Sequence, residues 1–169
     1  YDVKLPLTDV VLLPLGEPQR GDVVTFSSPQ DGTRLIKRIA AVPGDRVEMR
    51  NEVLYINGQA AQYDAPEVVQ EAVGVGATVQ ATRWTERLGG HERRVQWLHG
   101  VPARSTFDAI DVPAGQYLML GDNRDDSVDS RYIGLVPRHL LIGQARRVLV
   151  SADILGHWAP RLQRMGLPL

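Results

Sequence analysis

Acids, bases and hydroxyls alternate with unusual density in residues 121–134, a segment bounded by two glycines. Its sequence, Gly-Asp-Asn-Arg-Asp-Asp-Ser-Val-Asp-Ser-Arg-Tyr-Ile-Gly, holds four aspartates, two arginines and two serines. Four carboxylates this close together repel one another unless arginines and backbone N–H groups neutralise them. We therefore expect this acidic loop to be both an ion-paired scaffold and the wall of an active site.

A single lysine in an apolar segment is the second candidate for chemistry. The chain has nineteen basic residues, of which only Lys4 and Lys37 are lysines, so lysine is not what keeps this protein soluble. The run of residues 34–42, Arg-Leu-Ile-Lys-Arg-Ile-Ala-Ala-Val, predicts a strand. Alternation along a strand places Lys37 on one face with three apolar side chains, Leu35, Ile39 and Ala41.

The neighbouring Arg38 shares the opposite face with Ile36 and Ala40, and both faces are expected to be at least half buried. Arginine stays protonated, so Arg38 needs a carboxylate partner. Lysine can instead lose its proton, because burial among apolar groups lowers the pKa of an ammonium. A neutral Lys37 amine near pH 7 is a general base that can activate a hydroxyl. The alternative is a structural lysine whose ammonium reaches water at the strand edge.

The acidic loop offers partners for these cations. One of its aspartates can pair with Arg38 and another with Arg131, while a serine hydroxyl can hydrogen-bond Lys37 without fixing it as a cation. A hydroxyl that orients a neutral lysine is what a serine–lysine mechanism requires. The two features together favour the general-base hypothesis for Lys37.

Metal binding is the competing use of these acids. The spacing Asp125-x-Ser127-x-Asp129 lacks the central glycine and the terminal glutamate of a calcium loop. The histidines have no ligand spacing; they are His91, His99, His139 and His157. We therefore predict no metal and no cofactor.

Strand patterns bounded by turn residues dominate the chain and predict a mostly β fold. The expected strands are residues 22–26, 34–42, 47–49, 53–56, 107–112, 116–120 and 144–150. Residues 78–84 and 92–98 are expected to pair as a long hairpin inside an inserted β subdomain, residues 59–104. The catalytic core then consists of residues 1–58 and 105–155. Residues 156–169 form a tail that packs on the core or lies near a membrane.

Composition limits the classes of function. With 169 residues, a net charge of −1 and no cysteine, the chain has no global field for nucleic acid and no thiol chemistry. The longest apolar run, residues 10–15, is far too short to span a bilayer and is interrupted by Pro14. The sequence begins without methionine and in the middle of a pattern, so we expect it to be a fragment whose upstream part is absent.

Three segments in this order resemble the conserved boxes of bacterial type I signal peptidase (leader peptidase). They are residues 20–26, residues 37–45 and, almost letter for letter, residues 121–134. The resemblance implies a catalytic core of coiled antiparallel sheets with an inserted β subdomain. It also implies N-terminal helices that anchor the enzyme in the inner membrane, with the catalytic domain facing the periplasm.

The resemblance assigns roles to the loop and to the lysine strand. Lys37 takes the place of the general base, Ser127 that of the hydroxyl orienting it, and Ser130 that of a serine bordering the site. The supporting ion pairs implied by the resemblance are Asp129 with Arg131 and Asp122 with Arg38. Substrate-binding positions are implied at Leu35 and Ile36. The implied substrates are secretory precursor proteins, cleaved at sites of the Ala-x-Ala type.

One departure from the family pattern is important. The family's nucleophilic serine lies in a Ser-Met-x-Pro box, and this sequence contains no such box. We therefore predict that this fragment has no peptidase activity of its own. Two alternatives remain: a non-catalytic homologue acting as a binding or assembly domain, and another serine–lysine protease, such as a self-cleaving repressor-type enzyme. The long acidic loop argues against the second.

Overall fold

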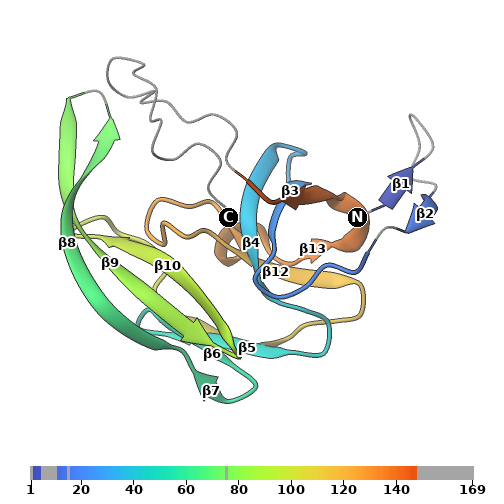
Figure 1. Cartoon of the computed structure of the whole chain (residues 1–169), viewed down its shortest axis with the longest axis horizontal. Helices are drawn as coiled ribbons and strands as arrows, with labels where there is room; N and C mark the ends of the chain where they lie inside the picture. Colours follow the sequence, from blue (N-terminus) through green and yellow to red (C-terminus); the bar gives the residue numbers. More distant parts are fainter. Residues whose placement is uncertain (1, 5–10, 15, 75, 148–169) are drawn as a thin grey trace.

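The computed structural model describes the backbone of residues 2–4, 11–14, 16–74 and 76–147. Antiparallel strands make up most of this part of the chain. Its helices are short, namely α1 (Ser130–Ile133) and the 3-10 helix η1 (Arg138–Leu140) (Figure 1). The mostly β prediction is confirmed. The predicted tail, residues 156–169, lies outside the described residues.

Two sheets form the core (Figure 1). The first has the strand order β13-β12-β4-β3-β14. Its strands are β3 (Val23–Ser27), β4 (Arg34–Ala41), β12 (Gln116–Leu120), β13 (Val136–Pro137) and β14 (Leu141–Ala145). The second has the order β11-β5-β6-β7, with β5 (Arg46–Arg50), β6 (Val53–Ile56), β7 (Gln59–Ala60) and β11 (Phe107–Asp111). A separate pair, β1 (Asp2–Lys4) and β2 (Val11–Pro14), is also antiparallel.

The last predicted strand begins earlier than the sequence pattern indicated. Strand β14 ends at Ala145, whereas the prediction placed the strand at residues 144–150. Its pairing with β3 explains the difference, because Leu141 already lies opposite Phe26. Residues 148–150 lie outside the described part of the chain.

Strand β12 lies between two hydrophobic clusters because its apolar side chains alternate between its two faces. Leu118 and Leu120 are buried in a cluster with strands β5 and β6. Tyr117 and Met119 are buried in a second cluster with β3 and α1. A strand that is buried on both faces is a rigid support, and the acidic loop begins directly after it.

The structure corrects two details of the predicted lysine strand. Ala41 packs in the cluster opposite to that of Ile39, because the β4–β12 pairing shifts register between these two residues. Strict alternation had placed both on the face of Lys37. Ile36 is 52% exposed, so its side of the strand is not uniformly half buried as expected.

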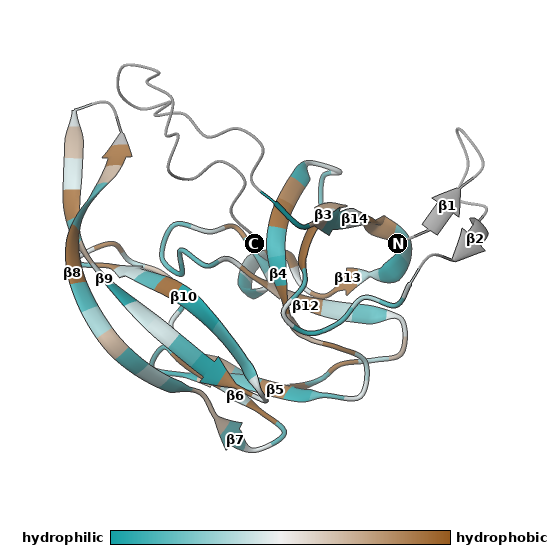
Figure 2. Cartoon of the chain, viewed as in Figure 1, coloured by the Kyte–Doolittle hydropathy of each residue, from teal (hydrophilic) through white to brown (hydrophobic). Residues whose placement is uncertain are grey.

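A third sheet, with the order β10-β9-β8, arches away from the core (Figure 1). It consists of β8 (Gln62–Gly74), β9 (Ala77–Leu88) and β10 (His91–Leu98). The β9–β10 pairing, with Val95 opposite Trp84, confirms the predicted hairpin. Strand β8 was not predicted. Hydrophilic and hydrophobic residues follow one another in bands along this sheet (Figure 2). The sequence of β8 therefore lacks the continuous apolar face from which a strand is predicted.

Backbone hydrogen bonds join the arched sheet to the acidic loop. Gln96 of β10 forms an isolated parallel bridge with Asn123. The Gln96 N–H donates to the Asp122 carbonyl at 2.8 Å, and the Arg124 N–H donates to the Gln96 carbonyl at 2.8 Å. The loop is therefore held by β12 on one side and β10 on the other.

Candidate active site

The buried pair Asp129–Arg131 holds the acidic loop in shape. Both carboxylate oxygens of Asp129 accept from the guanidinium, each at 2.8 Å, and both side chains are almost inaccessible (0% and 2%). Asp129 also caps α1 by accepting from the Arg131 N–H, and it accepts from the Gly121 N–H at 3.0 Å. The predicted pairing is confirmed. One carboxylate thus links the start of the loop to its end.

Further buried hydrogen bonds fix the end of the loop to the core. The Ser130 hydroxyl accepts from the Met119 N–H at 2.8 Å. Arg131 donates to the Arg104 carbonyl at 3.0 Å and to the Arg124 carbonyl. Ser130 therefore supports the loop from beneath, rather than lining the pocket described next.

The predicted pair of Arg38 with Asp122 is also present and lies in a wetter setting. The guanidinium makes two hydrogen bonds to the carboxylate, at 2.9 and 2.8 Å, and donates to the Gly21 carbonyl at 2.8 Å. The Arg38 side chain is 15% exposed and that of Asp122 is 44% exposed. This pair joins β4 to the beginning of the acidic loop at the rim of a pocket.

That pocket, the lysine pocket, has a volume of about 240 Å³ and brings Lys37 and Ser127 together. Its walls come from β3, β4 and the acidic loop: Val23, Ile36, Lys37, Arg38, Gly121, Asp122, Asn123, Asp126 and Ser127. Burial lowers the pKa of the Lys37 ammonium below its ordinary value of 10.5, and the charge of Arg131 lowers it further. The carboxylates of Asp129, Asp126 and Asp122 oppose this shift without cancelling it. At a given pH, a larger fraction of the Lys37 amine is therefore neutral than in an exposed lysine.

Ser127 packs against a glycine that leaves no room for a larger residue. A Cβ added at Gly121 would lie 2.1 Å from the Ser127 Oγ. Within the described residues that Oγ is buried and has no hydrogen-bond partner, so the predicted bond to Lys37 is not formed in this structure. A buried hydroxyl without a partner is costly, and the amine that shares its pocket is the group able to satisfy it.

The two positions expected to bind substrate differ in location. Ile36 is exposed and lines the lysine pocket. Leu35 instead packs against the hydrophobic cluster that contains Phe26. The side chain of Ile36 is therefore available to a ligand in the pocket, whereas Leu35 packs against the core and is not among the residues that line the pocket.

A buried charge cluster that sequence reasoning missed connects the arched sheet to the loop. Glu86 of β9 accepts from Arg93 at 2.5 Å, from Arg124 at 2.6 Å and from the Tyr63 hydroxyl at 2.8 Å. Burial opposes the charge of Glu86, yet Arg124 and Arg93 outweigh it and its pKa is lowered. Burial, together with the charge of Glu86, raises the pKa of Tyr63 to about 12.

A signal for this cluster was present in the sequence. On an alternating strand, Glu86 shares a face with Trp84 and Leu88, which marks an acid on an apolar face that needs buried partners. The partner Arg124 stands in the acidic loop, but nothing local in the sequence connects the two segments. Only the packing of β9 against the loop identifies them as a pair.

Metal sites and membrane-spanning helices are both absent from the described part of the chain. It contains no cluster of three or more His, Asp or Glu side chains placed to hold a metal ion. None of its helices is long and apolar enough to cross a bilayer.

Comparisons with known proteins match most of the chain. The family model "Signal peptidase, peptidase S26" matches residues 3–150. Signal peptidase I of Pseudomonas aeruginosa is 36% identical over 163 residues, which cover 89% of this chain and 56% of that protein. Signal peptidase I of Pseudomonas fluorescens is 34% identical over 183 residues, covering 99% of this chain and 62% of that protein. The chain thus spans little more than half the length of the curated relatives it matches.

A solved structure is also similar. The crystal structure of a signal peptidase I from Enterococcus faecalis V583 is 30% identical to this chain and gives a TM-score of 0.47. The match covers 78% of this chain and 99% of that one. The family assignment depends on the sequence matches.

Proposed function

Because this chain belongs to the signal peptidase, peptidase S26 family, we propose that it is part of the catalytic region of an endopeptidase that removes signal peptides from secreted precursor proteins. The observation that carries the proposal is the setting of Lys37. Its amine lines a pocket with Ser127, and burial lowers its pKa. A lysine amine is an effective general base only when it is neutral.

The proposed chemistry is amide hydrolysis by a serine–lysine dyad. Neutral Lys37 removes the proton of a serine hydroxyl as the oxygen attacks the scissile carbonyl, and the resulting ammonium returns the proton to the leaving amine. Water then hydrolyses the acyl-enzyme, with the lysine again acting as base. The serine must come from a Ser-Met-x-Pro box, which these 169 residues lack, so we propose that this chain alone is inactive.

The neighbouring residues have supporting roles in this proposal. Ser127 orients the Lys37 amine through one hydrogen bond in the active enzyme. Asp129 with Arg131, and Asp122 with Arg38, keep the acidic loop against β4. Ser130 acts as a positioning residue through its bond to the backbone of β12.

The proposed substrate lies extended beside residues 34–37 of β4, which do not pair with β12 and include the exposed Ile36. Binding along a strand edge uses backbone hydrogen bonds for affinity and alternate side-chain pockets for specificity. Cleavage at sites of the Ala-x-Ala type is part of this proposal because the family resemblance implies it. We propose that the whole protein acts at the bacterial inner membrane, with this region facing the periplasm.

A titration of this chain tests the general-base assignment directly. The chain has only two lysines, so ¹³C-methylated lysine resonances can be followed one by one by NMR. Lys37 is expected to titrate below the ordinary 10.5, because burial disfavours its ammonium form. An Arg38→Ala variant identifies any contribution of the neighbouring cation. Titration of Lys37 at or above 10.5 would contradict the assignment.

A cleavage assay on a chain that includes the Ser-Met-x-Pro box tests the activity. Lys37→Ala and Lys37→Arg should both abolish precursor cleavage, since arginine cannot lose its proton at working pH. Arg46→Ala, which removes an exposed cation from the other core sheet, should cleave at the parental rate. Cleavage by Lys37→Arg near that rate would exclude a lysine base.

A second candidate is a non-catalytic homologue that acts as a binding or assembly domain. The full reading frame distinguishes the two candidates. A Ser-Met-x-Pro box before Tyr1 supports the peptidase; a frame without that box supports the binding domain.

A further inference from the structure

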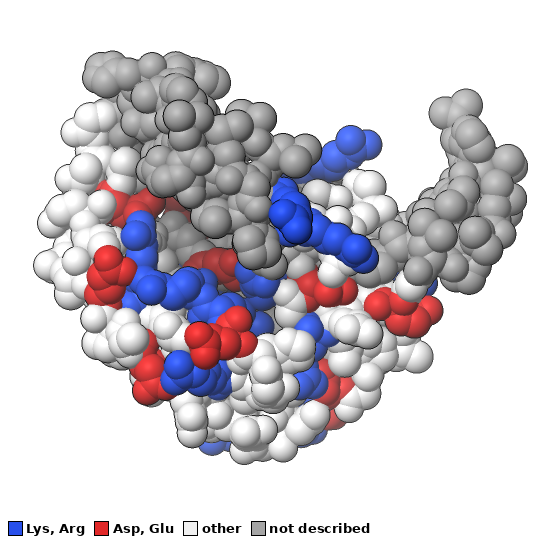
Figure 3. All heavy atoms as spheres, in the orientation of Figure 1, with Lys and Arg blue, Asp and Glu red and all other residues white. Residues whose placement is uncertain are grey.

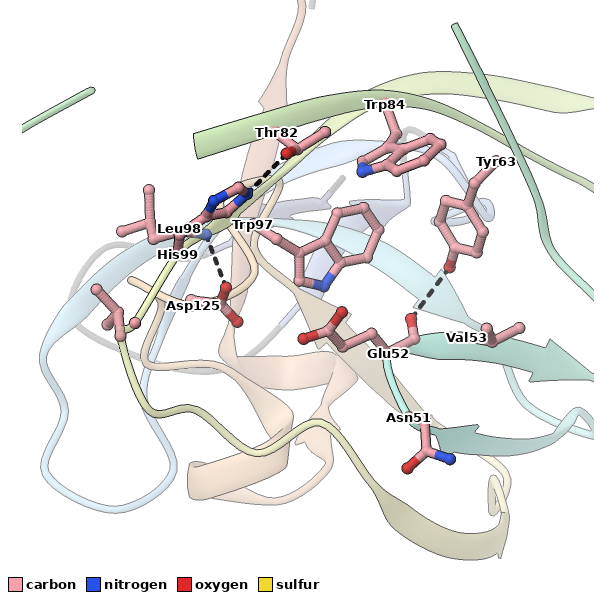
Figure 4. Close-up of a pocket in the computed structure, with 12 residues that line it drawn as sticks. Asn51, Glu52, Val53, Tyr63, Thr82, Trp84, Trp97, Leu98, His99 and Asp125 are labelled. Carbon is pink, nitrogen blue, oxygen red and sulfur yellow. Dashed lines mark hydrogen bonds between the residues drawn. The ribbon is translucent and has the colours of Figure 1, made fainter. Parts of the chain in front are cut away.

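A second, larger cavity of about 710 Å³ opens between the arched sheet, the β5–β6 turn and the acidic loop (Figure 4). Its lining residues are Asn51, Glu52, Val53, Tyr63, Thr82, Trp84, Trp97, Leu98, His99, Gly100, Val101 and Asp125. None of the residues assigned above to catalysis lines this aromatic pocket. It is therefore a separate site of unassigned function.

Aromatic rings form one side of the pocket. Trp84, Trp97 and Tyr63 gather there from β9, β10 and β8 (Figure 4). Tyr63 and Trp97 pack edge to face with ring centroids 5.2 Å apart, which fixes their orientation. The guanidinium of Arg124 lies 5.6 Å from the Trp97 ring centre, so this group of rings already accepts one cation from the protein.

Two carboxylates, and no lysine or arginine, complete the lining. Asp125 accepts from the Leu98 N–H at 2.8 Å (Figure 4). Burial raises the pKa of Asp125 despite that bond and despite the nearby charges of Arg131 and Arg124, and burial together with the charge of Asp125 raises the pKa of Glu52. The charge of Asp125 thus reaches Glu52, and no lysine or arginine is among the residues that line the pocket.

The backbone at Glu52 is unfavourable for glutamate. Asn51 and Glu52 form the two-residue turn between β5 and β6, with φ values of 47° and 72°. A turn of this type favours glycine at its second position, because a side chain is strained at positive φ. Glutamate at this position therefore lowers the stability of the fold. It also places a carboxylate beside the pocket.

We propose that the aromatic pocket binds the lysine or arginine side chain of a polypeptide. The positive group lies between Glu52 and Asp125, and the aliphatic stem packs on Trp84, which lines the pocket, is half buried and takes part in none of the cation–ring contacts of the described residues. The volume exceeds that of one side chain, so adjacent peptide backbone also fits, which favours a polypeptide over a free ammonium ion. An anion is repelled by the two acids.

Binding of capped tripeptides tests this proposal without any cleavage step, so it can fail independently of the peptidase proposal. Ac-Ala-Lys-Ala-NH₂ and Ac-Ala-Arg-Ala-NH₂ should shift the indole N–H resonances of Trp84 and Trp97 saturably in ¹⁵N NMR spectra. The norleucine and citrulline analogues, which match in shape and lack charge, should not. Equal shifts with the uncharged analogues, or shifts only around Lys37, would overturn the proposal.

Variants at Glu52 provide the matched comparison. Glu52→Gln should weaken binding of the lysine peptide about tenfold, because a hydrogen-bonded charge partner is lost. Glu52→Gly should weaken it as much while raising Tm, since glycine accepts the positive φ. Asp108→Asn removes an exposed acid outside the pocket and should bind like the parent. Unchanged binding in both Glu52 variants would refute the site, and stronger binding of phosphoethanolamine than of the peptides would exclude a polypeptide ligand.

Discussion

Two ion pairs of the same acidic loop, built from the same residue types, are placed in opposite environments. The side chains of Asp129 and Arg131 are 0% and 2% exposed, and the pair lies under the loop. Asp122 is 44% exposed and its partner Arg38 15%, at the rim of the lysine pocket. In the first pair, Asp129 accepts hydrogen bonds from backbone N–H groups as well as from the guanidinium. The second pair mainly connects β4 to the start of the acidic loop at a solvent-accessible surface.

The two pairs therefore have different roles: one maintains the conformation of the loop, and the other acts on the charge of the lysine pocket. A buried charge that loses its partner is very costly, whereas an exposed pair contributes little to stability. Asp129 is therefore expected to determine whether the acidic loop adopts its folded conformation. Asp122 is expected to adjust the electrostatics of Lys37, whose pKa its charge raises. On the surface shown in Figure 3, cations and anions are interspersed, so this distinction is one of burial rather than of overall field.

The strongest way to break the comparison is Asp129→Ala. It leaves Arg131 buried without a carboxylate and removes the acceptor of the Gly121 N–H, so we expect a loss of about 3–5 kcal/mol in the free energy of unfolding. Urea unfolding followed by circular dichroism measures this loss. A loss below about 1 kcal/mol would show that the buried pair does not hold the loop.

Gly121→Ala should have the next largest effect. The added methyl group would lie 2.1 Å from the Ser127 Oγ, so the serine must move, at a cost of about 1–3 kcal/mol. We expect the lysine pocket to lose Ser127, which the chemical shifts around Lys37 report. The double variant Gly121→Ala, Ser127→Gly removes the clash and should recover much of the stability. A single variant as stable as the parent would contradict the close contact.

Asp122→Asn tests the partly exposed pair and should cost only about 1 kcal/mol, because solvent reaches Asp122 and screens its charge. Asp111→Asn, which breaks the exposed pair with Arg46, is the matched control and should cost no more. Both are measured by the same unfolding experiment. A loss as large as that of Asp129→Ala would remove the contrast between the two ends of the loop.

We expect Asp126→Asn to have the smallest effect on stability. It should nevertheless shift the pKa of Lys37 and with it the pH dependence of the reaction. Asp126 is exposed, lines the lysine pocket, and raises the pKa of Lys37 by its charge. Without that charge the pKa of Lys37 falls further below 10.5. Since the neutral amine is the base, the rising limb of the pH–rate profile of the active enzyme should move to lower pH. A limb that moves to higher pH would reverse the assigned sign.

Much of the fold and of the candidate site could be predicted from local pattern. Short apolar runs bounded by turn residues predicted β3, β4 and β12, and two segments of the insertion were expected to pair as the β9–β10 hairpin. The density of acids and arginines identified the acidic loop. Because a buried cation must find a carboxylate, Arg38 and Arg131 were expected to pair with aspartates of this loop, and the family resemblance implied which ones, Asp122 and Asp129.

The sequence by itself therefore determined most strands of the core, the loop that carries the charges and the lysine that stands in an apolar strand. Only the tertiary structure decided the bulge that turns Ala41 to the other cluster, the exposure of Ile36 and the contact of Ser127 with Gly121. It also brought Glu52 and Asp125 to one pocket, although they are distant in the chain. The physical reason is that alternation and charge demand act over a few neighbouring residues. Sheet register and the packing of distant segments depend on the whole chain at once.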